Sequence, residues 1–268
     1  MFSNSVVIAL RLQLALLWWR VCALLLRLLH TQSLKPANQY FHKVVVIGDD
    51  FAAGVGDFVT LGKPAGLAQH LAPLIAHNDK VRHRWEIVNA GVPGSTSADW
   101  LLNAPTQYYN SVFAARSTVA DAEIVIVMLG STEIRDPKAD VVRIRKHLIA
   151  ICDALCKKGK RVCLATVASP APLKTGDSDT SPLNVALEEF CKSTSTDELP
   201  VVLGPRLDTY AFRRDTSLAF DGYHFNSSAY RLLARNAADF LVPMMTAVEW
   251  ATWKKQLNQV TYDKALYD

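Results

Sequence analysis

From residue 43 onward, short apolar runs alternate with longer amphipathic stretches. This alternation is typical of a parallel β-sheet that is covered by helices on both faces. The runs are rich in Val and Ile and are mostly apolar at every position, as strands buried between two helix layers must be. We therefore predict an α/β domain with three layers, α/β/α, whose strands lie at 44–47, 86–88, 124–129, 161–166 and 200–203.

Two helices are predicted with clear boundaries. Apolar residues recur at three- and four-residue steps across 137–158, and Gly159 follows the end of that helix. Asn226 is a good N-cap for a second helix, which we expect Pro243 to stop. We expect residues 246–267 to form a separate terminal helix.

The N-terminal segment is strongly hydrophobic. Residues 6–29 read VVIALRLQLALLWWRVCALLLRLL, which exceeds the roughly 20 residues that span a bilayer. Three arginines interrupt it, and an arginine at mid-membrane costs about 2.5–3.5 kcal/mol. Trp18 and Trp19 suit a membrane interface. The segment predicts a signal anchor or a helix that lies in the membrane interface, with a mitochondrial presequence and a cleaved secretory signal as alternatives.

These patterns divide the chain into four parts. We expect a membrane anchor or targeting segment at 1–30, a linker at 31–42, the α/β domain at 43–245 and a helical extension at 246–268. Attachment to an endomembrane through a signal anchor is the expected localisation, and the mitochondrion is the alternative.

Charge and cysteine content exclude several classes of function. The formal charge is +4, but residues 1–43 hold five basic residues and no acid, which leaves 24 basic and 25 acidic residues in the rest. A nearly neutral body lacks the basic surface that nucleic-acid binding requires. Cys152 and Cys156 share one helix face, where a cysteine usually acts as a small hydrophobic residue. No metal site and no cofactor is predicted, and the turn after the first strand has neither a GxGxxG nor a GK[ST] motif.

Polar motifs follow three of the predicted strands. GDDFAAGVGD (48–57) follows the first strand, NAGVPGSTS (89–97) the second and GSTE (130–133) the third. DGYHFN (221–226) stands just before the last long helix. Because active residues of open parallel sheets collect beyond the carboxyl ends of the strands, we expect these four segments to meet.

In this order, the four segments resemble the SGNH hydrolase family, also called GDSL esterases and lipases, over residues 43–242. The resemblance implies a flavodoxin-like parallel sheet, a Ser-His-Asp mechanism and hydrolysis of esters or of acylated or lipid molecules. Gly94, in its G-x-T-S context, matches the oxyanion-hole glycine. Asp221 and His224 match the acid that orients the histidine and the general base.

Two matched positions depart from the family pattern, and both concern the chemistry. The nucleophilic serine of the GDS motif is Asp50, and the oxyanion-hole asparagine is Thr132. A carboxylate at pH 7 has no proton to give, so His224 would become its ion-pair partner. Removing one oxyanion-hole donor typically costs about 2.7–4 kcal/mol. We therefore predict that ordinary serine-esterase chemistry at Asp50 is absent.

Three interpretations remain open. The site is degenerate and the domain serves as a binding or scaffold module, or the protein is a hydrolase with an altered mechanism. In the second case Asp50 is a carboxylate nucleophile, or it activates water with His224 and a cation held among Asp50, Glu133 and Asp221. In the third case another serine replaces the nucleophile, the candidates being Ser95, Ser97 and Ser131. The other histidines are expected to be surface or core residues without comparable partners: His30, His42, His70, His77, His83 and His147.

Overall fold

A five-stranded parallel sheet forms the centre of the protein. The computed structural model describes residues 4–29, 40–57, 65–168, 181–209, 211–212 and 215–257. The strand order is β2-β1-β3-β4-β5, and every neighbouring pair is parallel. All five predicted strands are present: β1 (Phe41–Gly48), β2 (Arg84–Asn89), β3 (Ile124–Met128), β4 (Arg161–Leu164) and β5 (Val201–Leu203). The direction in which strands are added reverses between β1 and β3, which is the flavodoxin-like order, and a crevice opens at such a reversal.

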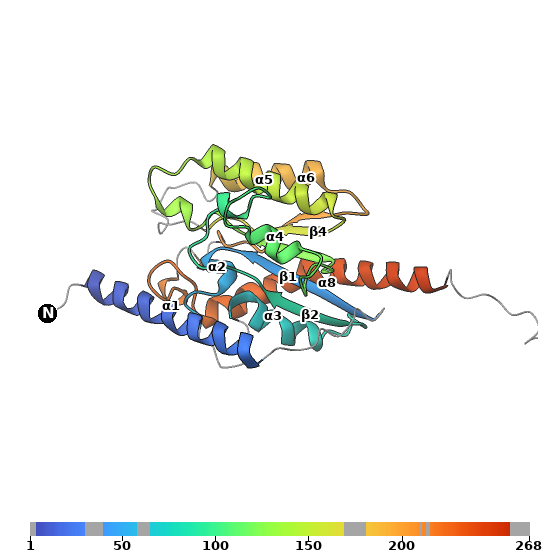
Figure 1. Ribbon diagram of the computed structural model, residues 1–268, viewed down its shortest axis with the longest axis horizontal. Coiled ribbons are helices and arrows are strands. Elements are labelled where there is room, and N and C mark those ends of the chain that lie inside the picture. The colour runs from blue at the N-terminus through green and yellow to red at the C-terminus, as the bar shows by residue number, and fades with distance from the viewer. Residues whose placement is uncertain are drawn as a thin grey trace, which may run out of the picture.

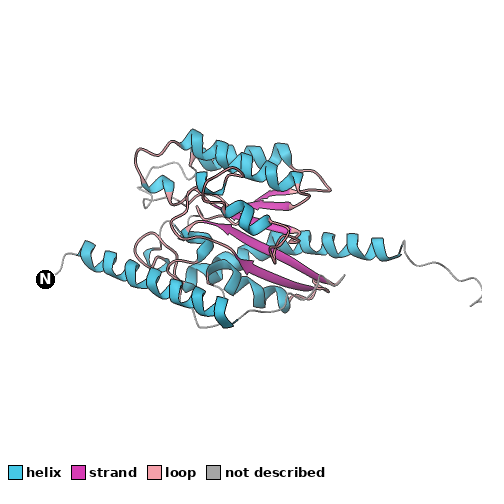
Figure 2. Ribbon diagram, in the orientation of Figure 1, coloured by secondary structure: helices cyan, strands magenta, loops and turns pink. Residues whose placement is uncertain are grey.

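Helices cover both faces of the sheet, so the predicted three layers are confirmed. Figure 1 shows α5 and α6 on one side of the sheet and α3 and α8 on the other, and Figure 2 shows the strands between these layers. The helices of the first side are α4 (Tyr108–Phe113), α5 (Val141–Lys157) and α6 (Pro182–Thr194). Those of the second side are α3 (Gly66–Ala76) and α8 (Ser227–Leu257).

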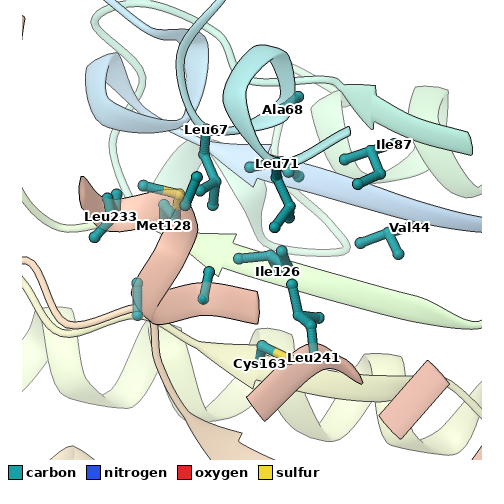
Figure 3. Close-up of a cluster of buried hydrophobic side chains, with 14 of the residues drawn as sticks. Val44, Leu67, Ala68, Leu71, Ile87, Ile126, Met128, Cys163, Leu233 and Leu241 are labelled. Carbon is teal, nitrogen blue, oxygen red and sulfur yellow. The ribbon is translucent and has the colours of Figure 1, made fainter. Parts of the chain in front are cut away.

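The side chains of β1 alternate between two hydrophobic clusters, one on each face. Val44 and Val46 belong to the cluster under α3 and α8, whereas Val45 and Ile47 belong to the cluster under α4, α5 and α6. In the close-up of the first cluster, Leu71 and Leu241 project toward the sheet (Figure 3). Because both faces of β1 are covered, this two-residue alternation explains why residues 44–47 are all apolar.

Two helix boundaries differ from the predicted ones. Helix α5 begins at Val141 and not near 137, because Asp140 is its N-cap and accepts a hydrogen bond from the N–H of Arg143 at 3.0 Å. At the start of α8 the prediction is correct: the Asn226 side chain accepts hydrogen bonds from the N–H groups of Ser228 and Ala229.

The expectation that Pro243 stops this helix is wrong, since α8 continues through it to Leu257. Proline lacks an N–H, so the carbonyl of Asp239 loses its helical donor. Both Asp239 and Pro243 are exposed, where water can hydrate the freed carbonyl. The helix keeps its direction because the residues on both sides of Pro243 are buried against the domain: Leu241, Val242, Met244 and Met245. The proposed division at 245 therefore falls inside one helix, and residues 258–268 of the predicted extension lie outside the described residues.

The last third of α8 reaches the edge strand β2. The Glu249 carboxylate accepts hydrogen bonds from the N–H groups of Arg82 and His83 and from Nε1 of Trp85, at 2.8–3.3 Å. Glu249 is buried, and these donors replace the water that its charge would otherwise require. Part of the predicted C-terminal extension thus belongs to the domain.

Helix α1 (Asn4–Leu29) lies along the body beside α2 (Asp50–Ala53), as Figure 1 shows. Trp19 Nε1 donates a hydrogen bond to the carbonyl of Ala53 at 3.0 Å, and Cys22 is buried against Ala65. Among the described residues, no helix has the length and apolar character needed to cross a membrane. The predicted linker falls mostly on residues that are not described, and Phe41 and His42 at its end belong to β1.

The end of β1 depends on a glycine. Gly48 has φ +145°, and a Cβ atom there would lie 1.8 Å from the carbonyl oxygen of Met128. That carbonyl accepts the N–H of Asp49 at 2.9 Å, so the close approach also fixes the start of the next segment.

We predict that Gly48→Ala lowers the free energy of unfolding by more than about 3 kcal/mol, because backbone must move to make room. The matched control is Gly159→Ala, which also has a positive φ, of +73°, but would meet no atom within 4 Å. It should cost only about 1 kcal/mol. Urea unfolding of both variants measures the difference, and equal losses would contradict this account of Gly48.

Candidate active site

The four sequence motifs meet beyond the carboxyl ends of β1 and β3. Asp50 begins α2 directly after β1, and Thr132 lies between β3 and the short helix η2 (Glu133–Arg135). Gly94 comes from the loop after β2, and the loop before α8 supplies Asp221 and His224. The structure therefore brings all five predicted site residues together.

Asp49 holds the ends of β1 and β3 in register. Its fully buried carboxylate accepts backbone N–H groups from Phe51 at 3.1 Å, Ser131 at 2.9 Å and Thr132 at 3.3 Å. Burial and the neighbouring charge of Asp50 raise the pKa of Asp49 to about 7, and the three N–H groups oppose that rise. The sequence reasoning noted Asp49 as part of a motif but assigned it no role.

His224 is held by Asp221 in the orientation that a catalytic histidine needs. Its Nδ1 lies 2.7 Å from Asp221 Oδ2, and its backbone N–H donates to Asp221 Oδ1, also at 2.7 Å. His224 is 1% exposed. Burial alone would lower the pKa of His224, but the hydrogen bonds and charges of Asp221 and Asp50 outweigh it and raise the pKa to about 9. Burial acts to raise the pKa of Asp221, yet the bonds to His224 bring it down to about 2.

Three of the predicted site residues contact the Asp50 carboxylate. Its Oδ1 accepts the N–H of Gly94 at 2.7 Å. Its Oδ2 accepts the Thr132 hydroxyl at 3.3 Å and lies 3.4 Å from His224 Nε2. Although burial acts to raise it, the pKa of Asp50 is lowered, chiefly because His224 bonds to the carboxylate and carries a positive charge. The site is therefore a chain of two carboxylates with an imidazolium between them.

This arrangement resembles an oxyanion hole that is already filled. An oxyanion hole works because its donors point at the place where negative charge develops in the transition state. Here a fixed carboxylate oxygen takes the Gly94 N–H, while Gly94 itself is exposed to solvent. A substrate carbonyl would have to displace Asp50 before it could bind that donor.

None of the three alternative serines has a hydroxyl available as a nucleophile. All three are buried: Ser95 Oγ donates to the carbonyl of Gly48 at 3.1 Å, and Ser131 Oγ accepts the N–H of Ala168 at 3.2 Å. Ser97 Oγ donates to Glu133 at 2.8 Å and also lies 2.9 Å from His147 Nδ1. Each hydroxyl thus joins two loops of the structure.

Glu133 faces away from Asp50. Both of its oxygens bind Ser97, one through the hydroxyl and the other through the backbone N–H at 2.7 Å. This bond ties the segment that carries Thr132 to the loop after β2. No group of three acidic, histidine or cysteine side chains in the described part of the chain is arranged to hold a metal ion. The expected cation among Asp50, Glu133 and Asp221 therefore lacks a ligand set.

Two of the other histidines do have carboxylate partners, contrary to expectation. His42 Nδ1 lies 2.8 Å from Glu123, and His70 Nε2 lies 3.1 Å from Asp57. His42 also lies 2.9 Å from His83, and His77 bonds the carbonyl of Pro73. These residues come together only through the fold, at 81 and 13 positions apart for the two acidic pairs, so no sequence motif marks them.

The rim of the site carries an aromatic residue and a cation. The Tyr223 hydroxyl donates to the carbonyl of Ser131 at 2.6 Å, and the guanidinium of Arg135 lies 4.9 Å from the Tyr223 ring centre. Tyr223 thereby joins the loop of His224 to the end of β3. Sequence reasoning missed both residues, although Tyr223 stands inside the DGYHFN motif.

Comparison with solved structures supports the same fold. A putative acylhydrolase from Bacteroides fragilis is similar, with 12% identity and a TM-score of 0.51, over 85% of this chain and 98% of that one. An acetylxylan esterase from Geobacillus stearothermophilus, crystallised as a catalytic mutant, has 17% identity and a TM-score of 0.54 over 74% and 93% of the two chains. TesA has 18% identity and a TM-score of 0.53 over 75% and 99%. At these identities, the likeness shows the fold alone.

Sequence comparison identifies the family. No curated protein matches this chain. The sequence profile described as the GDSL-like Lipase/Acylhydrolase family matches residues 46–232, which is more than half of the chain and includes all five site residues. The chain therefore belongs to the GDSL-like lipase/acylhydrolase family.

Proposed function

We propose that this protein is a family member that has lost serine-esterase catalysis and binds lipid or acylated molecules at a membrane surface. The observation that carries the loss of catalysis is the bond from the Gly94 N–H to the Asp50 carboxylate at 2.7 Å. It places negative charge where the family's reaction needs an empty, electropositive hole.

The protonation states of His224 and Asp50 support this proposal. A serine esterase needs a neutral histidine that accepts the nucleophile's proton. Because the pKa of His224 is about 9, this residue is an imidazolium at neutral pH. Asp50 has no proton to give, and its lowered pKa makes it a weak base. Neither step of proton transfer is therefore available near pH 7.

The surface of α1 supports the membrane part of the proposal. Large apolar side chains of this helix face solvent, among them Leu10 and Leu17 at 58–59% exposure. The described part of α1 carries no acidic residue, and Arg20 is exposed, where it can meet anionic headgroups. Its other side is fixed to the body through Trp19 and Cys22. A helix held in this way is suited to lie in the membrane interface with the domain attached.

The contact between His224 Nε2 and Asp50 Oδ2, at 3.4 Å, favours a second candidate, a hydrolase that uses Asp50 as a carboxylate nucleophile. The imidazolium of His224 could protonate a leaving alkoxide, and the neutral histidine could then activate water to hydrolyse the acyl-Asp50 anhydride. Against it, the Gly94 N–H is occupied by Asp50 and not by the substrate oxygen. Mass spectrometry after mixing with p-nitrophenyl acetate would reveal an acetyl group on the peptide that contains Asp50 if this candidate were correct.

The first prediction concerns turnover of p-nitrophenyl acetate. The parent should hydrolyse this ester no faster than His224→Ala. Asp50→Ser should restore His224-dependent turnover, and adding Thr132→Asn should raise it about 10- to 100-fold further by supplying an amide donor. Adding His224→Ala to the double variant is the control and should abolish the gain. Turnover by the parent that His224→Ala removes would replace the proposal with the hydrolase candidate.

The second prediction concerns pH. The pKa of His224 is about 9 in the folded protein and about 6.5 in an unfolded chain. The stability gained from its charge is therefore complete below about pH 6.5 and is lost as the pH rises to about 9. Between about pH 7 and 8.5 the free energy of unfolding should fall by up to about 1.4 kcal/mol per pH unit from this group, and the slope should halve near pH 9.

The matched variants for this pH dependence are Asp50→Asn and Asp99→Asn. Removing the charge of Asp50 should flatten the slope, since one of the two partners of the imidazolium is then neutral. Asp99 bonds Thr96, so Asp99→Asn should keep the slope of the parent. Urea unfolding at a series of pH values measures both, and equal slopes in all three proteins would contradict the ion chain.

The third prediction concerns membrane binding. Co-sedimentation of the full chain with vesicles of phosphatidylcholine and phosphatidylglycerol should be weakened at least about tenfold by either Leu10→Asp or Leu17→Asp, because burying one leucine contributes about 1.5–3 kcal/mol. Val142→Asp is the matched control, since Val142 is 62% exposed on α5. If the control weakens sedimentation as much, α1 is not the membrane-binding surface.

A further inference from the structure

A cavity of 570 Å³ lies between α1 and the body, outside the Asp50 crevice. One wall is the α1 face formed by Arg11, Leu14, Ala15 and Trp18. These positions are spaced at three- and four-residue steps, so they form one stripe about 10 Å long on the helix. Facing them are Phe220 from the loop before His224 and the segments 56–57 and 226–228.

The two ends of the α1 stripe differ in chemistry. Leu14, Ala15 and Trp18 offer apolar surface along most of its length. Arg11 stands at the other end, with its guanidinium 5.1 Å from the ring centre of Phe220, where a cation-π contact holds it in place. A long apolar wall with a fixed cation at one end matches a molecule that has an apolar tail and an anionic head.

The acidic residue in the wall is held by hydrogen bonds from within the protein. Asp57 accepts hydrogen bonds from the Gly66 N–H at 2.9 Å and from the Ser227 hydroxyl, and it lies 3.1 Å from His70 Nε2. Its side chain has no exposed surface. Because the Asp57 carboxylate is buried on these partners, the charged group that a ligand can reach is the Arg11 guanidinium.

We infer that this cavity binds a fatty carboxylate, with the acyl chain along Leu14, Ala15 and Trp18 and the carboxylate at Arg11. The volume lies within the usual range for sites of small ligands, about 300–1,000 Å³. The inference rests on the proposed lipid-binding function but adds a site that is separate from the Asp50 crevice. It also gives α1 a second role as one wall of a ligand pocket.

The cavity touches the segment that carries His224. A Cβ atom on Gly56, which lines it, would lie 2.6 Å from the carbonyl oxygen of Phe225 and 3.4 Å from His224 Cβ. The N–H of Phe220, another residue of the wall, donates to the His224 carbonyl at 2.7 Å. The pocket and the Asp50 site are thus neighbours that share one loop.

The test is calorimetric titration of the full chain with decanoate and dodecanoate. Binding should be saturable, and the two extra methylenes of dodecanoate should tighten it about 10- to 15-fold. Decyltrimethylammonium, which carries the opposite charge on the same chain, should bind at least about tenfold more weakly than decanoate. Equal binding of the two charge types would overturn the role of Arg11 and with it the proposed ligand class.

Two substitutions on α1 form a matched pair. Ala15→Trp fills the cavity and should weaken dodecanoate binding at least about tenfold. Leu17→Trp adds a similar bulk on the exposed side, where Leu17 is 58% exposed, and should leave binding unchanged. Arg11→Gln should weaken decanoate binding about tenfold and leave decanol binding unchanged. Equal affinity of the parent and Ala15→Trp would overturn the inference.

Vesicle co-sedimentation separates this inference from the proposed function. Ala15→Trp should still sediment with phosphatidylglycerol vesicles, because the exposed leucines of α1 are intact. A parent that sediments with vesicles but shows no saturable dodecanoate binding would refute the pocket and leave membrane binding in place. Similar thermal unfolding of Ala15→Trp and Leu17→Trp confirms that both variants are folded.

Discussion

The buried carboxylate of Asp49 is the constraint on which the site depends. It accepts N–H groups from the start of α2 and from the segment after β3, so it joins two strand ends that are about 80 residues apart in sequence. Those strands flank the reversal of strand order, where backbone groups have no sheet partner beyond the last residue. Without this acceptor, three buried N–H groups would lack a partner, and Asp50 and Thr132 would not be held opposite each other.

A carboxylate next to a carboxylate is costly unless donors surround both. The two adjacent acids solve this problem differently. Asp49 is enclosed by backbone N–H groups, whereas Asp50 shares a proton-bearing imidazole with Asp221. The charged groups Asp50, His224 and Asp221 therefore have fixed positions in the site. This arrangement favours stable ion pairs over proton transfer. Such order is compatible with a binding role, in which the crevice keeps its shape without turning over a substrate.

Sequence patterns predicted the sheet well and the helix ends less well. The central strands β1 and β3 could be located because a two-sided buried strand leaves an uninterrupted run of Val and Ile. The order of the four motifs placed Asp50, Gly94, Thr132, Asp221 and His224 at one edge of the sheet. By contrast, the rule that proline stops a helix failed at Pro243, because buried neighbours on the same helix outweigh one lost hydrogen bond.

The contacts between distant segments could not be read from the sequence. Nothing in the local pattern indicates that Glu133 bonds Ser97 and not a cation, or that the Asp50 carboxylate turns toward the Gly94 N–H. Likewise, the hydrophobic N-terminal segment predicts a membrane helix equally well whether or not it packs on the body. Only the bond from Trp19 to Ala53 and the burial of Cys22 show that one side of α1 is already occupied.

The clamp that Glu249 forms on the start of β2 has a consequence for synthesis of the chain. The ribosome releases β2 long before residue 249, so the N–H groups of Arg82 and His83 have to wait for their acceptor. During that interval the backbone that leads into the edge strand β2 has two unpaired N–H groups, to which another chain can bind. The helix that passes Pro243 without stopping thus supplies the acceptor for these two N–H groups, and this corner of the domain folds only after residue 249 has been made.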